Sequence, residues 1–384
     1  MQLKLSIATA VLLIGVSSQA EDYVSFQYLQ YNENDNRTTV SAPSIMINKD
    51  FGVDYTLNAS FVGDAVSGAS PTYYDTASGA SAFSRGTNLR ASDVKYANVE
   101  YEDTRLAASL SLTSRFANRD ELTIGLNRSS ESDFYSSEVS AEYMHWLDDS
   151  KNQSISLGLS YQYNEILVTC VENSSCSVDV ASGASQKMDA NLINAQLSFS
   201  QNIDSRSYAK FALYTILEDG YLTNPYMNVV RNYNEILDTA DIVAENRPDS
   251  KTAFGGSVKY ANALTDTISL QLAYRYYSDD WGISSNTLDS DVYFQYNEDW
   301  IFKLGLRGYV QSEADFYSAD KDYFTNEIYA SSDQRMSDFS SVTYKSDVNY
   351  KVSQDLSVNL SINYYDQSTG NSATYFMSGF KYSF

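Results

Sequence analysis

The stretch ISLGLSYQY, residues 155–163, alternates between two kinds of side chain. Every second position is apolar or aromatic, from Ile155 to Tyr163, and Ser, Gly, Ser and Gln fill the positions between them. Successive side chains of a β-strand point to opposite faces. This period of two therefore predicts a strand with one apolar face and one face of small polar groups.

The same alternation recurs at residues 193–199, 268–276 and 356–364, and no stretch sustains a helical period. A soluble β-sandwich buries its apolar faces, whereas a membrane barrel turns them to lipid. Here the apolar faces end in tyrosine, as the aromatic girdles of barrels do, and the polar faces resemble the lining of a lumen. We expect an all-β protein, a transmembrane antiparallel β-barrel with long outer loops, and keep a secreted sandwich as the alternative.

Counting the alternating segments tests this expectation, because closed bacterial barrels usually have an even number of strands. We predict about sixteen strands, with 14 or 18 as alternatives. Residues 94–115 could form a hairpin turning at Glu102 and Asp103, but one long strand keeps the phase of its leucines and the even count. The predicted strands are 22–31, 39–48, 53–66, 94–115, 121–131, 137–147, 153–166, 187–200, 206–217, 252–261, 267–276, 287–296, 300–312, 341–351, 356–365 and 373–384.

The predicted connections alternate in length, as they do in outer-membrane barrels. Short turns fall at 49–50, 148–149, 202–204, 262–263, 297–299 and 353–354, and long loops near 67–93, 167–186, 218–251, 277–286 and 313–340. The last strand ends on Phe384, in phase with other aromatics. A terminal aromatic of this kind resembles the tail that the barrel assembly machinery reads, so we expect that machinery to be a partner.

Composition and charge agree with a membrane barrel and exclude other classes. The chain has 33 Tyr and 17 Phe, although its mean hydropathy is only −0.36. Its net charge of −23 excludes nucleic acid as a partner, since binding phosphate needs clustered Lys and Arg. Outer-membrane lipid is the expected environment, with acidic outer loops in water.

The first residues predict a secretory signal peptide. Lys4 precedes an apolar run over 5–16, and Ser18-Gln19-Ala20 gives a small-x-small pattern for cleavage after Ala20. We therefore divide the chain into a signal peptide, 1–20, and a single barrel domain, 21–384, located in the bacterial outer membrane.

The two cysteines, Cys170 and Cys176, lie close together in a predicted outer loop. A secreted protein favours a disulfide between them. A metal site is the rival interpretation, but it needs about four ligands and no His is near.

Nothing in the sequence points to catalysis or to a cofactor. The single histidine, His145, lies near the periplasmic end of a strand, whereas a Ser–His or Asp–His site would need partners near the outer rim. Phosphate-loop and nucleophile-elbow motifs are absent from the sequence. We expect no enzyme activity and no bound cofactor or metal.

Basic residues on the predicted lumen face are the sharper candidates. Their strand phase points Arg105, Arg275, Lys303 and Arg307 inward. In so acidic a chain they need partners, which we expect to be carboxylates across the lumen. They either brace the wall through ion pairs or form a constriction that sets ion selectivity.

Several motifs, in a fixed order, resemble an uncharacterised bacterial family of outer-membrane barrels with a domain of unknown function. They cover nearly the whole mature chain and include an outer-loop motif with Asp279, Asp280 and Trp281, followed by Asp315. Met227, directly after the motif GYLTNPY, stands where a lysine is expected. The motifs are DAVSGASP (64–71), SESDFYS (130–136), GYLTNPY (220–226), ENRP (245–248), YRYYSDDWGI (274–283), RGYVQS (307–312) and ADFY (314–317).

The resemblance implies a barrel but no established activity, and it points to an envelope protein, such as a redox protein, as a partner. Two functions remain open. The first is a channel or porin-like route for small solutes or ions. The second is a barrel plugged by its loops, which acts as a scaffold or receptor for an envelope component. An open lumen distinguishes the first from the second.

Overall fold

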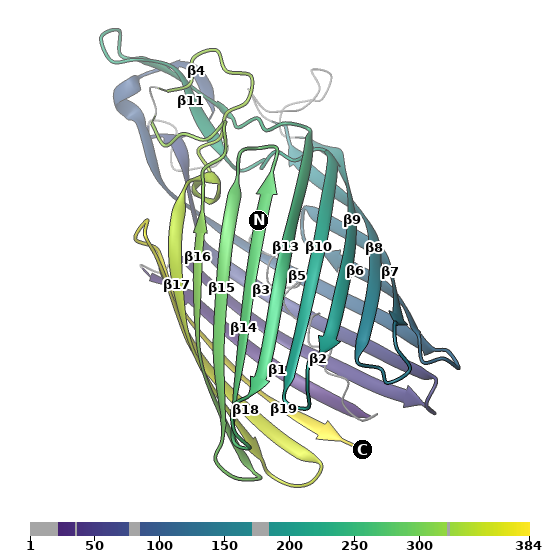
Figure 1. Ribbon diagram of the computed structural model, residues 1–384. Helices are drawn as coiled ribbons and strands as arrows, with labels where there is room; N and C mark the ends of the chain where they lie inside the picture. The colour runs from purple at the N-terminus through teal and green to yellow at the C-terminus, as the bar shows by residue number, and fades with distance from the viewer. Residues whose placement is uncertain (1–21, 35–36, 77–84, 171–183, 321–322) are drawn as a thin grey trace.

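A computed structural model gives the architecture and describes residues 22–34, 37–76, 85–170, 184–320 and 323–384. The predicted signal peptide lies outside these residues. Within them, no helix is long and apolar enough to span a membrane. Sixteen antiparallel strands close into a barrel (Figure 1), which confirms the predicted fold class and strand number.

Each of the sixteen predicted segments overlaps one barrel strand, and residues 94–115 form one strand as expected. The barrel strands are β1 (Tyr23–Glu33), β2 (Thr38–Phe51), β3 (Tyr55–Asp75), β5 (Val94–Arg115), β6 (Glu121–Ser130), β7 (Phe134–Trp146), β8 (Gln153–Thr169), β9 (Ser185–Asn202), β10 (Ser207–Gly220), β13 (Ser250–Ala263), β14 (Ile268–Asp279), β15 (Ser284–Gln295), β16 (Trp300–Gln311), β17 (Phe339–Lys351), β18 (Leu356–Gln367) and β19 (Ser372–Ser383).

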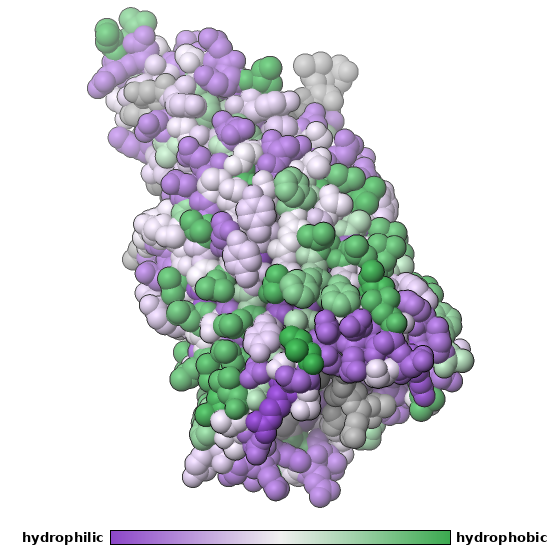
Figure 2. Space-filling view, in the orientation of Figure 1, coloured by the Kyte–Doolittle hydropathy of each residue, from purple (hydrophilic) through white to green (hydrophobic). Residues whose placement is uncertain are grey.

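The apolar phase of each strand faces outward and the polar phase faces the lumen. On β8, Leu157 and Leu159 are 51% and 53% exposed, whereas Ser156 on the other face is 8% exposed. A soluble sandwich would show the opposite pattern. Figure 2 shows the corresponding gathering of hydrophobic residues on the barrel wall, below a mostly hydrophilic outer end.

The barrel closes where β1 pairs with β19 in continuous register. Phe26 stacks on Phe380 across this seam, with ring centroids 5.9 Å apart. The backbone N–H of Phe384 donates to the carbonyl of Asp22 at 2.9 Å, so the last residue is joined to the start of β1. The two ends of the described chain thus complete the wall without an exposed strand edge.

A second sheet, which the sequence did not predict, lies beyond the long-loop end of the barrel. It contains β4 (Gly86–Leu89), β11 (Asn228–Asn234) and β12 (Thr239–Ala244) in the order β11-β12-β4. Its apolar side packs on the long extensions of β3 and β5, where Tyr73 and Val94 are buried against Val230 and Ile242. We call this sheet, these extensions and the β16–β17 loop (312–338) the outer cap (Figure 1).

The outer cap joins opposite walls of the barrel. In the ring of sixteen strands, β3 and β5 stand eight places from β14 and β15. The segment with β11 and β12 ends at β13, and the β16–β17 loop begins at β16, so both join strands that flank β14 and β15. The backbone N–H of Asn228 donates to Thr72 of β3 at 2.9 Å, and the hydroxyl of Tyr73 donates to the carbonyl of Ala319 at 2.6 Å. Because these contacts connect facing walls, the cap spans the mouth of the barrel.

Candidate functional site

The lumen face below the cap carries the basic residues that the sequence singled out. Arg105 is 7% exposed and lies directly opposite Asp64 of β3. Its Nη2 and Nε atoms lie 2.6 and 2.8 Å from Asp64 Oδ2. Arg105 is therefore buried on the inner face, opposite in phase to the exposed Leu106, and its ion pair ties β5 to β3.

Lys303 and Arg307 belong to a row of charges on β15, β16 and β17. Lys303 Nζ lies 2.5 Å from Asp347 Oδ2, and Arg307 Nε lies 4.0 Å from Asp289 Oδ2. Lys345, which the sequence did not single out, bonds both Asp291 (2.7 Å) and Asp289 (3.2 Å). The partners lie on neighbouring strands of one wall, so the expectation of carboxylates across the lumen was wrong for these residues.

Gly305 makes room for this row. A Cβ atom at Gly305 would lie 2.0 Å from Asp291 Oδ1 and 2.7 Å from Lys345 Cε, because the Lys345–Asp291 pair crosses directly over it. Any larger residue would have to displace the pair. The glycine therefore permits the ion pair that joins β17 to β15.

Arg275 differs from the other predicted lumen residues because it pairs with an aromatic side chain. Its Nε donates to the hydroxyl of Tyr214 at 2.8 Å, and its guanidinium lies 5.0 Å from the centre of that ring. Among the described residues, no carboxylate lies within ion-pair distance of it.

The outer-loop motif forms a turn rather than a long loop. Only residues 280–283 separate β14 from β15, so the predicted loop at 277–286 was wrong in length. Asp279 accepts from the backbone of Trp281 (3.1 Å) and Ile283 (2.9 Å), and Asp280 accepts from the backbone of Thr252 (2.9 Å). These two aspartates hold the turn and the neighbouring strand together.

Trp281 is the centre of an apolar core in the mouth of the barrel. It is 5% exposed, meets Phe316 edge to face at 5.2 Å, and packs with Ile166 and Val168 of β8. Ile166 and Val168 share the lumen phase of Ser156, so the lining changes from polar to apolar at the outer end of β8.

Asp315 attaches the cap loop to this core. Its backbone N–H donates to the carbonyl of Trp281 at 2.9 Å. Gly282 has φ +90°, and a Cβ there would lie 2.4 Å from Asp315 Oδ1. Glycine is thus required at position 282 for two reasons, the positive φ of its backbone and the close approach of the Asp315 side chain.

A buried ionic cluster holds the cap together. Arg247 and Glu245 are fully buried, with Arg247 Nε 2.7 Å from Glu245 Oε1 and Arg247 Nη2 2.8 Å from Asp333 Oδ2. Ser331 donates to Glu245 at 2.5 Å. Because Glu245 and Arg247 precede β13 and Asp333 lies in the β16–β17 loop, the cluster ties two loops to each other.

Burial and charge act on the two carboxylates in different ways. Burial raises the pKa of Glu245, although Arg247 opposes this shift. Burial also disfavours ionisation of Asp333, but Arg335 and Arg247 outweigh it and hold the pKa of Asp333 below its usual range. The family motif ENRP contains Glu245 and Arg247, which is the sequence signal for this cluster. Met227, where a lysine was expected, is buried, and its carbonyl accepts from the backbone N–H of Glu245 at 3.0 Å.

His145 belongs to a hydrogen-bonded cluster at the short-turn end. Its Nδ1 lies 2.8 Å from Asp120 Oδ2, which also accepts from the hydroxyl of Tyr143 at 2.7 Å. These bonds, with that from His145 first, hold the pKa of Asp120 well below its usual range. Asp120 is thereby a fixed acceptor that joins the turn before β6 to β7.

Replacing Asp120 with Asn should lower the temperature at which the folded barrel unfolds in detergent. Since the pKa of Asp120 is lowered by folding, its contribution is complete above the ordinary carboxyl pKa of about 4 and is lost as pH falls. The difference from wild type should therefore narrow between about pH 5 and about pH 2. Gel migration of unboiled samples at each pH measures the unfolding temperature. The control is Asp266→Asn, because the side chain of Asp266 is exposed. A difference in unfolding temperature between Asp120→Asn and wild type that stays the same at every pH would contradict this prediction.

Three carboxylates, of Asp103, Glu131 and Asp133, lie within 4.8 Å of one another at the outer rim. Such a group has the donor chemistry for a divalent cation. However, Ser132 donates to Asp103 at 3.0 Å and the hydroxyl of Tyr226 donates to Asp133. Protein groups therefore already satisfy part of this cluster.

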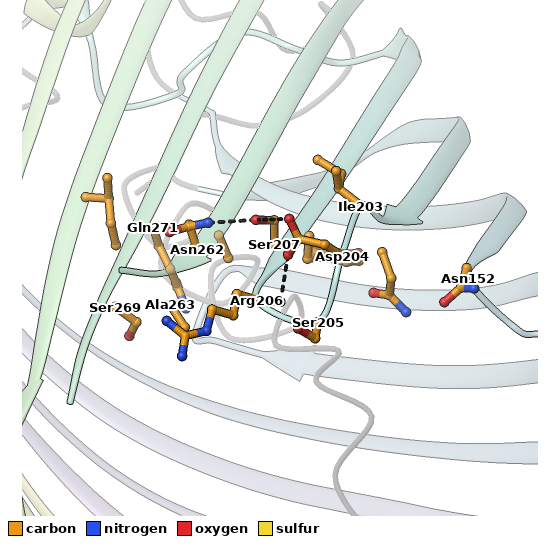
Figure 3. Close-up of a pocket in the computed structure, with 14 residues that line it drawn as sticks. Asn152, Ile203, Asp204, Ser205, Arg206, Ser207, Asn262, Ala263, Ser269 and Gln271 are labelled. Atoms are coloured by element: carbon orange, nitrogen blue, oxygen red, sulfur yellow. Dashed lines mark hydrogen bonds between the residues drawn. The ribbon is translucent and has the colours of Figure 1, made fainter. Parts of the chain in front are cut away.

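Two cavities lie at opposite ends of the wall formed by β10, β13 and β14. One of about 730 Å³ at the short-turn end is lined by polar residues of the β9–β10 turn and by Asn262 and Gln271 (Figure 3). The other, of about 220 Å³, lies below the cap between Trp281, Tyr309 and the ion pair of Lys251 with Glu218 (2.6 Å).

Cys170 is 2% exposed, at the outer end of β8. Its predicted partner, Cys176, lies outside the described residues. The disulfide therefore stays a prediction.

An antiparallel barrel with an apolar outer face, a polar lumen and a capped mouth is the fold of an outer-membrane β-barrel protein. The chain belongs to the family described as protein of unknown function DUF3570, whose profile matches residues 4–381. This confirms the resemblance to an uncharacterised barrel family. No functionally curated protein matches the sequence.

Solved structures resemble the chain at low sequence identity. CdiB from Acinetobacter baumannii is 8% identical with a TM-score of 0.52, covering 95% of this chain and 60% of its own. The CymD monoaromatic hydrocarbon channel is 10% identical with a TM-score of 0.45, covering 96% and 89%. A Pseudomonas aeruginosa FadL homologue is 9% identical with a TM-score of 0.44, covering 94% and 90%.

Proposed function

We propose that this protein is an outer-membrane channel for small solutes and that the cap closes its outer mouth in this structure. The main support is the lining of the lumen. Its side chains are mostly small and polar along β8 and β9, and its charged side chains form ion pairs on β15 to β17. A barrel of about sixteen strands is wide enough to enclose an aqueous route.

The cap gives this channel a gate. It closes the mouth with side chains from separate loops, which meet through the apolar core at Trp281 and the ionic cluster at Arg247. Neither contact is covalent, so the loops can separate while the barrel stays intact. The β16–β17 loop takes part in both contacts and is the segment that would move.

Conductance in planar lipid bilayers tests the channel. Wild-type protein should give small or rare steps, and a variant with residues 312–338 replaced by an Asn-Gly hairpin turn should give large, steady ones. Gel migration of unboiled samples would establish that both are folded. A folded variant that stays silent would show that the lumen is not a route.

The second candidate is a non-conducting barrel whose cap binds another envelope protein. One observation favours it: large apolar side chains are exposed on the cap, with Ile236 at 96%, Leu237 at 70% and Ile328 at 75%. Where such side chains form a continuous apolar patch, they mark a protein contact. A silent but folded loop variant would direct the search to this surface.

A further inference from the structure

The wall formed by β10, β13 and β14 carries basic side chains that differ from the other lumen charges. Lys210 and Lys259 are direct partners in the register of β10 and β13. They share the lumen face, because the alternate positions, Phe211 and Val258, are 48% and 39% exposed on the lipid side. Like charges directly opposite each other destabilise a strand pair.

Arg275 completes this group. It lies on β14 opposite Ser257 of β13, and Ser257 is the next lumen-facing residue to Lys259 on that strand. Tyr214 holds its guanidinium through a hydrogen bond of 2.8 Å and a ring contact. The remaining lumen-facing positions of this patch are small: Ala212, Ser257 and Ala273. Three long basic side chains therefore lie next to small ones on this part of the lumen face.

Among the described residues, none of these three basic side chains has a carboxylate within the 4.0 Å of an ion pair. Asp289, which lies opposite Ala273 and acts on Lys259 from a greater distance, already pairs with Arg307 and Lys345. Four other basic residues on β13, β16 and β17 each have a carboxylate within 4.0 Å: Lys251, Lys303, Arg307 and Lys345. The chain has 49 acidic residues against 26 basic ones, so a partner would be easy to supply. An ionisable group left unpaired inside a membrane protein points to a ligand or an ion pathway.

We propose that Lys210, Lys259 and Arg275 form a binding site for a small oxyanion, a carboxylate or phosphate solute, on the lumen wall. The proposal rests on the channel function and names its substrate class. Two ammonium groups and a guanidinium offer charge-assisted hydrogen bonds that suit oxyanions. An acidic protein repels anions as a whole, so an anion needs such a local site to pass.

Two measurements test the site separately from the channel. The first is the reversal potential of the 312–338 loop variant in a KCl gradient. It should indicate preference for chloride, and Lys210→Gln with Lys259→Gln should shift it toward potassium. The matched control is Lys151→Gln with Arg206→Gln, which removes the same charge from turns at the short-turn end and should shift it little.

The second measurement needs no conductance. Inorganic phosphate should raise the unfolding temperature of the wild-type protein in detergent, and the Lys210/Lys259 double variant should need roughly tenfold more phosphate for the same rise. Conductance without anion preference, or equal phosphate effects on both proteins, would overturn the site while leaving the channel. A silent loop variant whose phosphate effect still depends on the lysines would overturn the channel and retain the site.

Discussion

Replacing Arg247 with methionine should detach the outer cap while the barrel stays folded. Methionine keeps the volume but leaves Glu245 fully buried without its counter-charge and removes one of the two arginines that neutralise Asp333. Removing one partner of a buried ion pair costs about 3–5 kcal/mol. Hydrogen exchange of residues 222–249 and 312–338 should speed up accordingly, and exchange in β6 to β9 should not change.

A matched control is Arg206→Met at the short-turn end. Arg206 also forms an ion pair, 2.8 Å from Asp266, but both side chains are exposed. Exposed pairs contribute about 0–1 kcal/mol. If Arg247→Met altered exchange no more than Arg206→Met, the ionic cluster would not be what holds the cap.

The barrel was predictable because its signal is local. Alternation over 155–163 assigns both a strand and its two faces, and lipid outside with water inside requires the pattern to repeat in every strand. Residues 94–115 were assigned correctly as one strand because Leu106, Leu110 and Leu112 share one phase and a single strand keeps the strand number even. Such signals need no knowledge of which strands are neighbours.

The cap was not predictable because its signal is not local. Strands β4, β11 and β12 are short, and their apolar residues become buried only when loops from opposite walls meet. One trace was present in the sequence: Ile166 and Val168 are apolar at positions where the lumen phase requires polar residues. That break in the pattern marks the point where the mouth is filled.

The charged residues of the lumen were predictable in part, unlike the barrel, which was predicted, and the cap, which was not. Strand phase placed Lys303 and Arg307 on the inner face, but only the register shows that Asp347 and Asp289 lie opposite them. Lys210 was missed because a single lysine in a strand gives no sign of a second lysine facing it. Strand phase shows only that a basic residue faces the lumen. Strand register shows whether a carboxylate lies opposite it, as in an ion pair that braces the wall, or another basic residue, as in the proposed binding site.

Replacing Trp281 with alanine should open the mouth from the lumen side. Truncating a buried tryptophan costs about 3–5 kcal/mol, and Trp281 also donates from its ring nitrogen to the carbonyl of Ser250 at 2.9 Å. Open events in bilayers should become more frequent than in wild type. Trp300→Ala is the control, because Trp300 stacks on Phe302 and packs at a tilt against Tyr350 at the short-turn end, far from the mouth.

The two cap variants together show whether the cap is one gate. Phe316, which packs on Trp281, and Asp333, which binds Arg247, belong to the same loop. If that loop moves as a unit, either change alone releases it, so the combined Trp281→Ala and Arg247→Met variant should open little more than each single variant. Such non-additivity is the mark of coupled sites. Additive effects would instead mean that the mouth has two independent closures, and that displacement of the 312–338 loop alone does not control passage through the lumen.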